Sequence, residues 1–296
     1  MSEYFDSIVV PVDFSSRTSP TLKQAYILAM LMNIDVALLY VYNKNSEEKN
    51  DILKKIVDSK NDLSEKELIK RELVSLSAKA SEKYDIKFYP VITEGEVAES
   101  IVEFAKKNEA RMIIMGNAGL AHIHNNKNLT PAIGSNTSQV IRKAECPVLT
   151  INSKVVYDID SILVPVNLNK PIEKKLNWAM YFARYFGSLI KIISIINVAE
   201  MDKKPEYEEM LNNIKKELND NNIFCLTNLL LSTSDSSEIG KTIVNYAKEN
   251  ECDLIITMTQ EEDRNNKMFI GGTTTSVIKN SENPVLSVTP QTNTDI

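Results

Sequence analysis

The chain contains one long segment twice, and this duplication constrains its fold more than any other feature. The motif "SIVVPVDFSS" beginning at Ser7 returns as "SILVPVNLNK" at Ser161, an offset of 154 residues (161 minus 7). Near the end of each copy, "CPVLTI" at Cys146 returns as "NPVLSV" at Asn283, an offset of 137 (283 minus 146). A repeat of this length predicts two domains that share one fold.

The composition agrees with two ordinary globular domains. We place the boundary in "SKVVYDID", which gives domains of residues 1–153 and 154–296. Each domain is then large enough to bury a core of its own. Hydrophobic residues make up 43% and charged residues 25% of the chain, so neither disorder nor a fibrous architecture is indicated.

Short apolar runs alternate with helical patterns in each half. Ile8–Val12 is rich in β-branched residues, as expected for a buried parallel strand. Ser19 and Pro20 then suit the cap and first turn of a helix with apolar residues on one face. Residues 46–83 are highly charged but carry apolar residues at helical spacing, which indicates a helix with a solvated face. The alternation predicts an α/β fold of two tandem, doubly wound, parallel-sheet (Rossmann-like) domains.

Ligands bind to such sheets at the carboxyl ends of the strands, and the sequence has loop glycines there. Gly116 and Gly119 follow the fourth apolar run, and Gly134 with Ser135 opens the next helix. Glycine lets the backbone approach a ligand and adopt a positive φ, and N–H groups at a helix start donate to anions. The pattern indicates a phosphate site, although any helix entry favours the same residue types, and no G-x-x-x-x-G-K-[ST] loop is present.

Five motifs in a fixed order make the interpretation more specific. They are "VVPVDFS", "LLYVYN", "MGNAG", "GSNTSQVI" and "CPVLTI", over about 150 residues. In this order they resemble the universal stress protein family, and the duplication resembles its tandem two-domain members. The resemblance implies an adenine nucleotide alpha hydrolase-like fold. It also implies that the chain binds ATP, with AMP or another adenine nucleotide as alternatives, either with or without Mg²⁺.

Carried over residue by residue, the resemblance implies a nucleotide site in the first domain. Asp13 matches the acidic residue that contacts the nucleoside, and Val41 matches the residue that lines the adenine pocket. The implied contacts are Pro11, Val12, Asp13, Val41, Met115, Gly116, Gly119, Gly134, Ser135, Asn136 and Thr137. Fourteen residues separate the last two glycines where the family has nine, so the loop carries five extra (14 minus 9). A longer loop costs little closure entropy and can still fold back.

The second domain departs from this pattern. Residues Met258, Thr259, Gln260 and Glu261 occupy the four positions from Gly116 to Gly119, so both glycines are lost, and Asn167 replaces the acidic residue. Only the far end of the glycine loop survives. Side chains where the backbone must approach phosphate, together with added negative charge, predict that this domain does not bind ATP.

Two other functions compete with nucleotide binding. One is a nucleotide-free interaction or scaffold protein of the same fold, which the lengthened loop favours. The other is a weak ATP-hydrolysing enzyme, but no acid and base are placed for hydrolysis, so no catalytic residue is predicted. His122 and His124 suggest a metal, yet their neighbours Asn125 and Asn126 are poor zinc ligands, so no metal site is predicted.

Charge and segment composition bear on partners and location. The net charge is -6 and the sequence pI is about 5.2, which disfavours binding to nucleic acid or to anionic membranes. The first residues lack a signal-peptide pattern and no run of about 18 apolar residues occurs, so we expect a cytoplasmic location and no membrane association. Cys146, Cys225 and Cys252 are too few and too scattered for a disulfide framework, so we expect small buried hydrophobes.

The last apolar run of each domain bears on assembly. By the family resemblance, "PVLTI" and "PVLSV" pair across domain interfaces, which implies an internal pseudo-dimer. Long apolar edges tend to be covered, so we also expect a homodimer of chains, with a monomer as the alternative.

Overall fold

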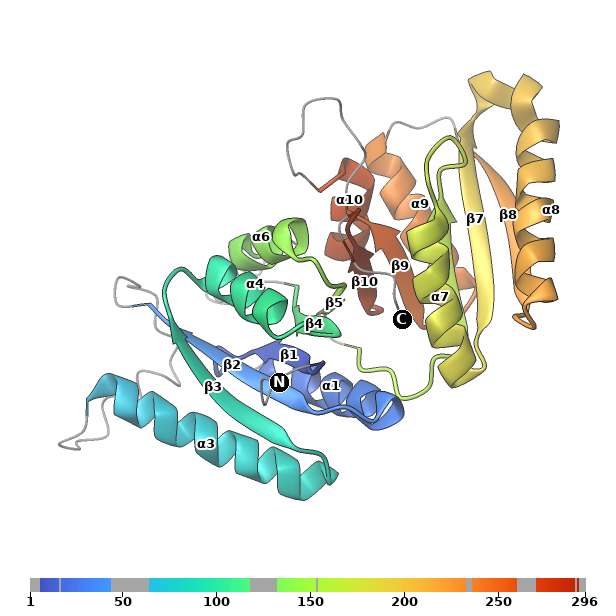
Figure 1. Ribbon diagram of the computed structural model, residues 1–296. Helices are drawn as coiled ribbons and strands as arrows, with labels where there is room; N and C mark the ends of the chain where they lie inside the picture. The colour runs from blue at the N-terminus through green and yellow to red at the C-terminus, as the bar shows by residue number, and fades with distance from the viewer. Residues whose placement is uncertain are drawn as a thin grey trace. The chain divides into compact units, whose positions relative to one another are not determined.

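The computed structural model describes residues 6–15, 17–43, 64–117, 132–152, 154–232, 236–259, 270–290 and 292. They belong to two compact units, Met1–Val155 and Val156–Ile296. Each unit contains five parallel strands with helices on both faces of the sheet (Figure 1). The predicted class, tandem doubly wound α/β domains, is confirmed.

In the first unit the strands follow the order β3-β2-β1-β4-β5. Their bounds are β1 Ile8–Pro11, β2 Val36–Tyr42, β3 Phe88–Glu94, β4 Met112–Gly116 and β5 Val148–Ile151. In the parallel register, Ile8 aligns with Val36 on one side and with Met112 on the other. The strand order reverses between β1 and β4, so their carboxyl ends form the topological switch point where ligands bind in such sheets.

The helices of the first unit divide between the two faces of its sheet (Figure 1). On one face lie α1 Thr18–Met32 and α3 Glu65–Tyr84; on the other lie α4 Val97–Lys107 and α6 Ser135–Lys143. The predicted start of the first helix is wrong, because Arg17 is the N-cap and Ser19 lies inside the first turn. The Thr18 N–H donates to the Ser15 carbonyl at 3.1 Å, and this turn brings the helix start forward.

The second unit repeats this topology with the order β8-β7-β6-β9-β10. Its strands are β6 Ser161–Val166, β7 Leu189–Asn197, β8 Cys225–Ser232, β9 Leu254–Met258 and β10 Val285–Val288. Its helices are α7 Glu173–Phe186, the short 3-10 helix η1 Val198–Lys203, α8 Lys204–Asp220, α9 Ser236–Glu249 and α10 Gly272–Asn280. The duplication in sequence is therefore a duplication of fold.

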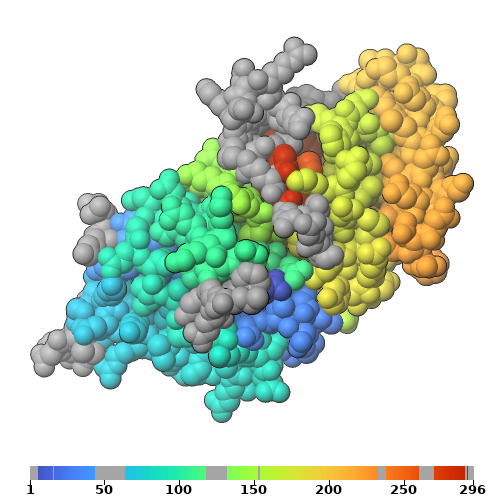
Figure 2. Space-filling view, viewed as in Figure 1, coloured from blue at the N-terminus to red at the C-terminus, as the bar shows by residue number. Residues whose placement is uncertain are grey.

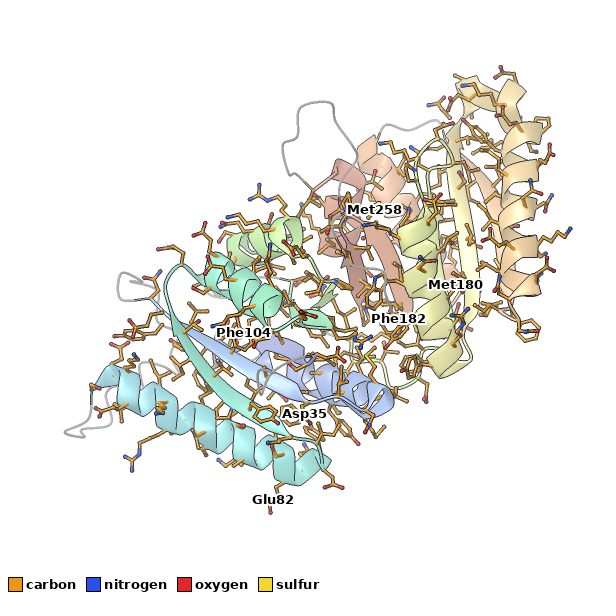
Figure 3. The ribbon with its side chains drawn as sticks, in the orientation of Figure 1. Asp35, Glu82, Phe104, Met180, Phe182 and Met258 are labelled. Carbon is orange, nitrogen blue, oxygen red and sulfur yellow. The ribbon has the colours of Figure 1, made fainter. Side chains whose placement is uncertain are left out.

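The central strands are buried on both faces, as their continuous apolar runs predict. Ile8, Val36 and Ile113 are fully buried in the first unit, and Ile162 and Ile255 are fully buried in the second. Aromatic side chains fill part of the core of the second unit. Phe182 lies on the inner side of α7 (Figure 3) and is fully buried beside Trp178. Each sheet is thus a rigid support for the loops at its carboxyl edge.

The charged segments form outer helices, as predicted. The surfaces of α3 (cyan) and α8 (orange) lie at the exterior of their own units (Figure 2). Ser64 and Glu67 form a capping box that starts α3, and the apolar positions Ile69 and Leu73 are buried. Of the predicted charged run, residues 46–63 lie outside the described residues.

The cysteines, the metal ligands and the membrane segments considered in the sequence can be located in the structure. Cys225 and Cys252 are buried as small hydrophobes, and Cys146 is partly exposed. Within the described ranges, no group of three or more metal-ligating residues comes together. Among these same residues, no helix has the length and apolar character that crossing a membrane requires.

Gly240 allows α9 and α10 to pack closely, and this contact gives a test of the second core. A Cβ atom at Gly240 would lie 2.4 Å from the Ser276 Cβ and 3.0 Å from the Thr273 carbonyl oxygen. We expect Gly240→Ala to lower the free energy of unfolding by about 1–3 kcal/mol, because overpacking forces the helices apart. Urea unfolding followed by the single tryptophan, Trp178, measures the change.

The control is the double variant Gly240→Ala/Ser276→Gly, which removes the two side-chain atoms of Ser276 that the new Cβ would meet. It should recover part of the loss, although glycine in a helix costs about 1 kcal/mol. An unchanged stability of Gly240→Ala would show that the two helices are not in tight contact.

Candidate functional site

The loop after β1 brings Asp13 to the carboxyl edge of the first sheet in a strained turn. The Ser15 N–H donates to Asp13 Oδ1 at 2.9 Å. Between them Phe14 has φ 55°, and its ring packs 5.6 Å from the ring of Tyr40. Left-handed backbone is unusual for a bulky residue, and such outliers cluster at functional sites. The burial of Tyr40, followed by nearby negative charges including Asp13, raises its pKa to about 12.

The start of α6 is tied to the end of β4 by two hydrogen bonds. The Gly134 N–H donates to the Asn117 carbonyl at 2.9 Å, and the Thr137 hydroxyl donates to the Gly116 carbonyl at 3.0 Å. The positive φ expected for the loop glycines is wrong at Gly134, whose φ is -59°. As the N-cap it supplies no side-chain acceptor, so the first N–H groups of α6 lack a side-chain cap.

Arg17 also reaches this point, and sequence reasoning missed it. Its Nη1 donates to Asn117 Oδ1 at 2.9 Å, which joins the loop after β1 to the end of β4. Burial lowers the pKa of the guanidinium and the charge of Asp13 raises it, and arginine stays protonated at neutral pH. The available signal was its place in "DFSSRTS", as the first basic residue after the strand.

The other predicted contacts lie at the ends of the same three strands. Pro11 ends β1, and the buried Val12 donates its N–H to the Leu39 carbonyl at 2.9 Å. Val41 lies two residues further along β2 and is half-buried, while Met115 precedes the last residue of β4.

On the helix side, Ser135 and Asn136 are exposed in the first turn of α6. Gly119, His122 and His124 lie outside the described residues. The described members of the predicted set therefore share one edge of the first sheet.

The second unit keeps the same backbone ties with different side chains. The Asn169 N–H donates to Asn167 Oδ1 at 3.0 Å, as Ser15 does to Asp13. The Gly271 N–H donates to the Thr259 carbonyl at 3.1 Å, and the Thr274 hydroxyl donates to the Met258 carbonyl at 2.6 Å. These hydrogen bonds, which we call the frame of the site, are thus preserved together with the glycine at the helix start, while the glycine at the strand end and the carboxylate are replaced by Met258 and Asn167.

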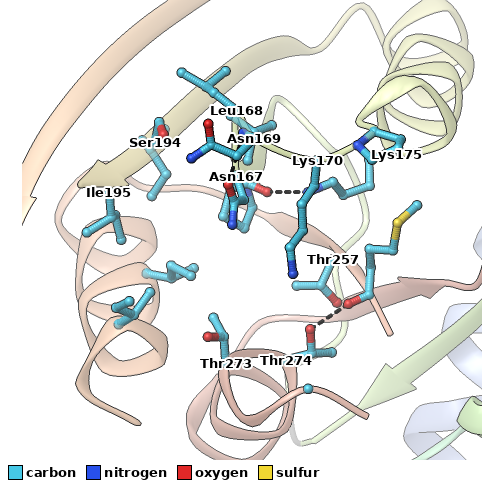
Figure 4. A pocket seen from close by; sticks show the side chains of 18 of the residues that line it. Asn167, Leu168, Asn169, Lys170, Lys175, Ser194, Ile195, Thr257, Thr273 and Thr274 are labelled. Atoms are coloured by element: carbon cyan, nitrogen blue, oxygen red, sulfur yellow. Dashed lines mark hydrogen bonds between the residues drawn. The ribbon is translucent and has the colours of Figure 1, made fainter. Parts of the chain in front are cut away.

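A cavity of about 780 Å³ lies at this edge of the second unit (Figure 4). Its lining includes the repeat counterparts of the first-domain site: Pro165, Val166, Asn167, Ile195, Thr257, Met258, Gly271, Thr273 and Thr274. It also includes Lys170, Lys174 and Lys175, which sequence reasoning did not single out although they cluster in "NLNKPIEKK". The replacement of the phosphate-loop residues has therefore not filled the second site.

Lys175 is an unusual member of this lining because it is only 7% exposed. Its Nζ donates to the Pro165 carbonyl at 2.7 Å. Burial, and then the neighbouring charge of Lys170, lower the pKa of Lys175 to about 8. Lys174 instead donates to the carbonyls of Pro290 and Thr292, the latter at 3.0 Å.

Comparison with known proteins gives the family. The model of the universal stress protein family matches residues 5–152 and 230–289. The chain belongs to the universal stress protein family. The second matched region of this universal stress protein begins after the segment that carries Lys170 and Lys175.

Individual relatives agree with this assignment. The universal stress proteins MJ0531 and MJ0577 of Methanocaldococcus jannaschii are similar to parts of the chain. MJ0531 is 26% identical over 50% of this chain and 82% of its own length, and MJ0577 is 29% identical over 52% and 99%. A solved universal stress protein of Archaeoglobus fulgidus shares the fold over 96% of this chain and 98% of its own, with 19% identity and a TM-score of 0.73.

The buried Lys175 predicts a pH-dependent stability. Its pKa is about 8 in the folded chain and the ordinary value is 10.5. Below pH 8 the lysine is charged in the folded and in the unfolded chain, so the burial of its charge opposes folding. Between pH 8 and pH 10.5 the folded chain has released the proton while the unfolded chain still holds it, so the stability of the wild type rises with pH. Lys175→Met should therefore be more stable than the wild type at pH 7, and this advantage should shrink by on the order of 3 kcal/mol by pH 10.5.

Urea unfolding of both proteins at several pH values, followed by Trp178 fluorescence, measures the difference. Lys216→Gln, which removes an exposed charge on α8, should show no such trend. A stability difference between wild type and Lys175→Met that does not depend on pH would contradict the assignment of a buried, charged lysine.

Proposed function

We propose that this universal stress protein is a non-catalytic regulatory protein that binds ATP, or another adenine nucleotide, through its first unit. One observation carries the proposal: Asn117 accepts hydrogen bonds both from the Arg17 guanidinium and from the residue that starts α6. Its side chain accepts from Arg17 at 2.9 Å, and its carbonyl accepts from the Gly134 N–H at 2.9 Å. Positive charge and the uncapped N–H groups of α6 therefore meet at the switch point of the sheet.

A phosphate chain would suit a position between the Arg17 guanidinium and the first N–H groups of α6. Its oxygens would accept from the N–H groups of Ser135, Asn136 and Thr137, and the helix dipole favours the negative charge. The Arg17 guanidinium adds a charge-assisted donor, which is stronger than a neutral one. Gly134 has no side chain to separate the backbone from the phosphate.

The nucleoside would lie across the ends of β1 and β2. Asp13 would accept from ribose hydroxyls, and the half-buried Val41 with Met115 would provide apolar surface for the adenine. The described residues do not offer a three-ligand metal group, so an accompanying Mg²⁺ would be held mainly by phosphate oxygens. Binding through the first unit alone, a homodimer of chains and a cytoplasmic location remain predictions.

Equilibrium binding of labelled ATP to the full chain tests the proposal. Gly116→Val puts a side chain where the backbone approaches phosphate, and Asp13→Ala removes the nucleoside contact. We expect each change to weaken binding at least about tenfold, because Asp13→Ala removes a hydrogen bond to a charged group and the side chain of Gly116→Val blocks the approach of the phosphate. Asn167→Ala, the matched change in the second unit, should leave binding unchanged.

Circular dichroism would verify that each variant folds. The absence of saturable ATP binding would favour the nucleotide-free scaffold function instead. ATP binding that neither Gly116→Val nor Asp13→Ala weakens would show that the nucleotide site lies elsewhere in the chain.

Arg17 gives a second prediction, specific to the phosphates. Arg17→Gln should weaken ATP binding roughly tenfold, because it removes one charge-assisted donor. Binding of adenosine, which has no phosphate, should not change. Isothermal titration calorimetry with both ligands measures the two effects, and an equal loss for ATP and adenosine would show that Arg17 acts only through the fold.

A further inference from the structure

We propose that Lys175, in the cavity of the second unit, is a reactive amine that binds a small aldehyde with an apolar body covalently, as an imine. This inference goes beyond the proposed function and does not depend on the first unit. It rests on a buried amine in the cavity lining, on a buried hydroxyl without a partner in the same lining, and on an apolar wall.

Lys175 is held in the cavity by a single hydrogen bond. It is 7% exposed, and its side chain extends from α7 toward the end of β6 (Figure 4), where its Nζ donates to the Pro165 carbonyl at 2.7 Å. An ammonium group has three donors, and within the described part of the chain this carbonyl is its one acceptor. Buried charges are normally paired, so the site suits a neutral amine, which donates to Pro165 and keeps a free lone pair.

The surroundings of Lys175 make the neutral amine available near pH 8. Burial, and then the neighbouring charge of Lys170, lower its pKa from 10.5 to about 8. At pH 8 about half of this side chain is neutral, a fraction on the order of a hundredfold larger than for a lysine of ordinary pKa. Lysines that are activated by desolvation form imines with carbonyl compounds.

A buried hydroxyl lines the same cavity. Thr257 is 3% exposed, and its Oγ1 has no hydrogen-bond partner among the residues that the structure describes. The parallel register of β6 and β9 pairs Leu163 with Ile255, and two residues further along it aligns Thr257 with Pro165, which holds Lys175. Buried polar groups are normally paired, so the Thr257 hydroxyl would donate to the oxygen of an aldehyde bound at Lys175.

Another part of the wall is apolar, which gives the aldehyde its body. Ile195 of β7 and the α9 residues Ile239 and Ile243 line it. The cavity volume, about 780 Å³, lies in the range of small-molecule sites, roughly 300–1,000 Å³. An aliphatic chain attached to the reacting carbonyl would therefore be bound along this wall.

The chemical step needs no reactant besides the aldehyde. The neutral amine of Lys175 adds to the carbonyl carbon, a C–N bond forms, and a proton passes from the nitrogen to the oxygen to give a carbinolamine. The oxygen then leaves as water, and a protonated imine remains. In total, lysine ammonium and aldehyde give protonated imine and one water, so atoms and charge balance. The N–H of this imine can donate to the Pro165 carbonyl, as the ammonium does.

Reductive trapping on the full chain tests the inference, with hexanal as the probe. At pH 8, sodium cyanoborohydride reduces each imine to a stable secondary amine. The amino terminus also reacts at this pH, so mass spectrometry of the peptides locates each modification. We expect Lys175 to be modified at least about tenfold faster than Lys216, an exposed lysine of α8, because more of its amine is neutral.

The other titratable side chains of the cavity supply an internal comparison. Among its described lining residues they are Lys170, Glu173, Lys174, Glu200 and Tyr207. We expect Lys175 to be modified faster than either of the two other lysines, although they line the same cavity. A rate at Lys175 no higher than at Lys216, or a preference for Lys170 or Lys174, would overturn the proposal.

Acetaldehyde, which lacks the apolar chain of hexanal, tests the apolar wall. We expect the ratio of the hexanal rate to the acetaldehyde rate to be at least about tenfold larger at Lys175 than at Lys216, because the additional CH₂ groups are buried in the cavity. The same ratio at both lysines would contradict binding of the aldehyde in this cavity.

Two variants test the role of Thr257. Thr257→Val keeps nearly the same shape without the hydroxyl, and we expect it to slow the modification of Lys175 about tenfold. Thr257→Ser, which restores a hydroxyl, should recover most of the rate, while the rate at Lys216 should be the same in all three proteins. An unchanged rate at Lys175 in Thr257→Val would overturn the assignment of this hydroxyl to the site.

Discussion

The tie between the fourth strand of each unit and the helix that follows it determines where ligand chemistry can occur. In both units a glycine N–H and a threonine hydroxyl of the helix start donate to consecutive carbonyls at the strand end. The helix therefore begins at the switch point of a parallel sheet, with its first N–H groups uncapped by any side chain. The phosphate contacts proposed for the first unit depend on this arrangement.

The two units differ in the side chains mounted on this shared frame. In the first, Asp13, Arg17 and a glycine-lined strand end combine a carboxylate, a guanidinium and open backbone. In the second, Asn167 and Met258 stand at the positions of Asp13 and Gly116, and Lys170 lies in the loop after β6. Duplication has kept the hydrogen bonds that position the helix, while the residues that would meet a ligand have diverged.

The fold and the frame of the site could be predicted from the sequence, because both are encoded by local patterns. Repeat offsets and buried apolar runs predicted the strands of the sheets, and the helical spacing of apolar residues in the charged segment predicted the helix that forms α3. The start of α1 was predicted wrongly, since the turn made by Ser15 and Thr18 outweighed the local cap signals.

The cations of the two sites could not be predicted. The roles of Arg17 and Lys175 depend on how loops after β1 and β6 fold back across the sheet edge, and no periodicity encodes such a path. The cavity beside Lys170 was also unforeseen, because the loss of the glycines predicted a lost phosphate site and gave no sign of open space.

A crystal structure of the full chain grown with ATP tests the central claim most directly, namely that one frame carries two different sites. We predict nucleotide density in the first unit alone, with phosphate oxygens at the start of α6 and within hydrogen-bond distance of Arg17. Nucleotide in the second cavity, or phosphates in the first unit that contact neither Arg17 nor the start of α6, would contradict the account.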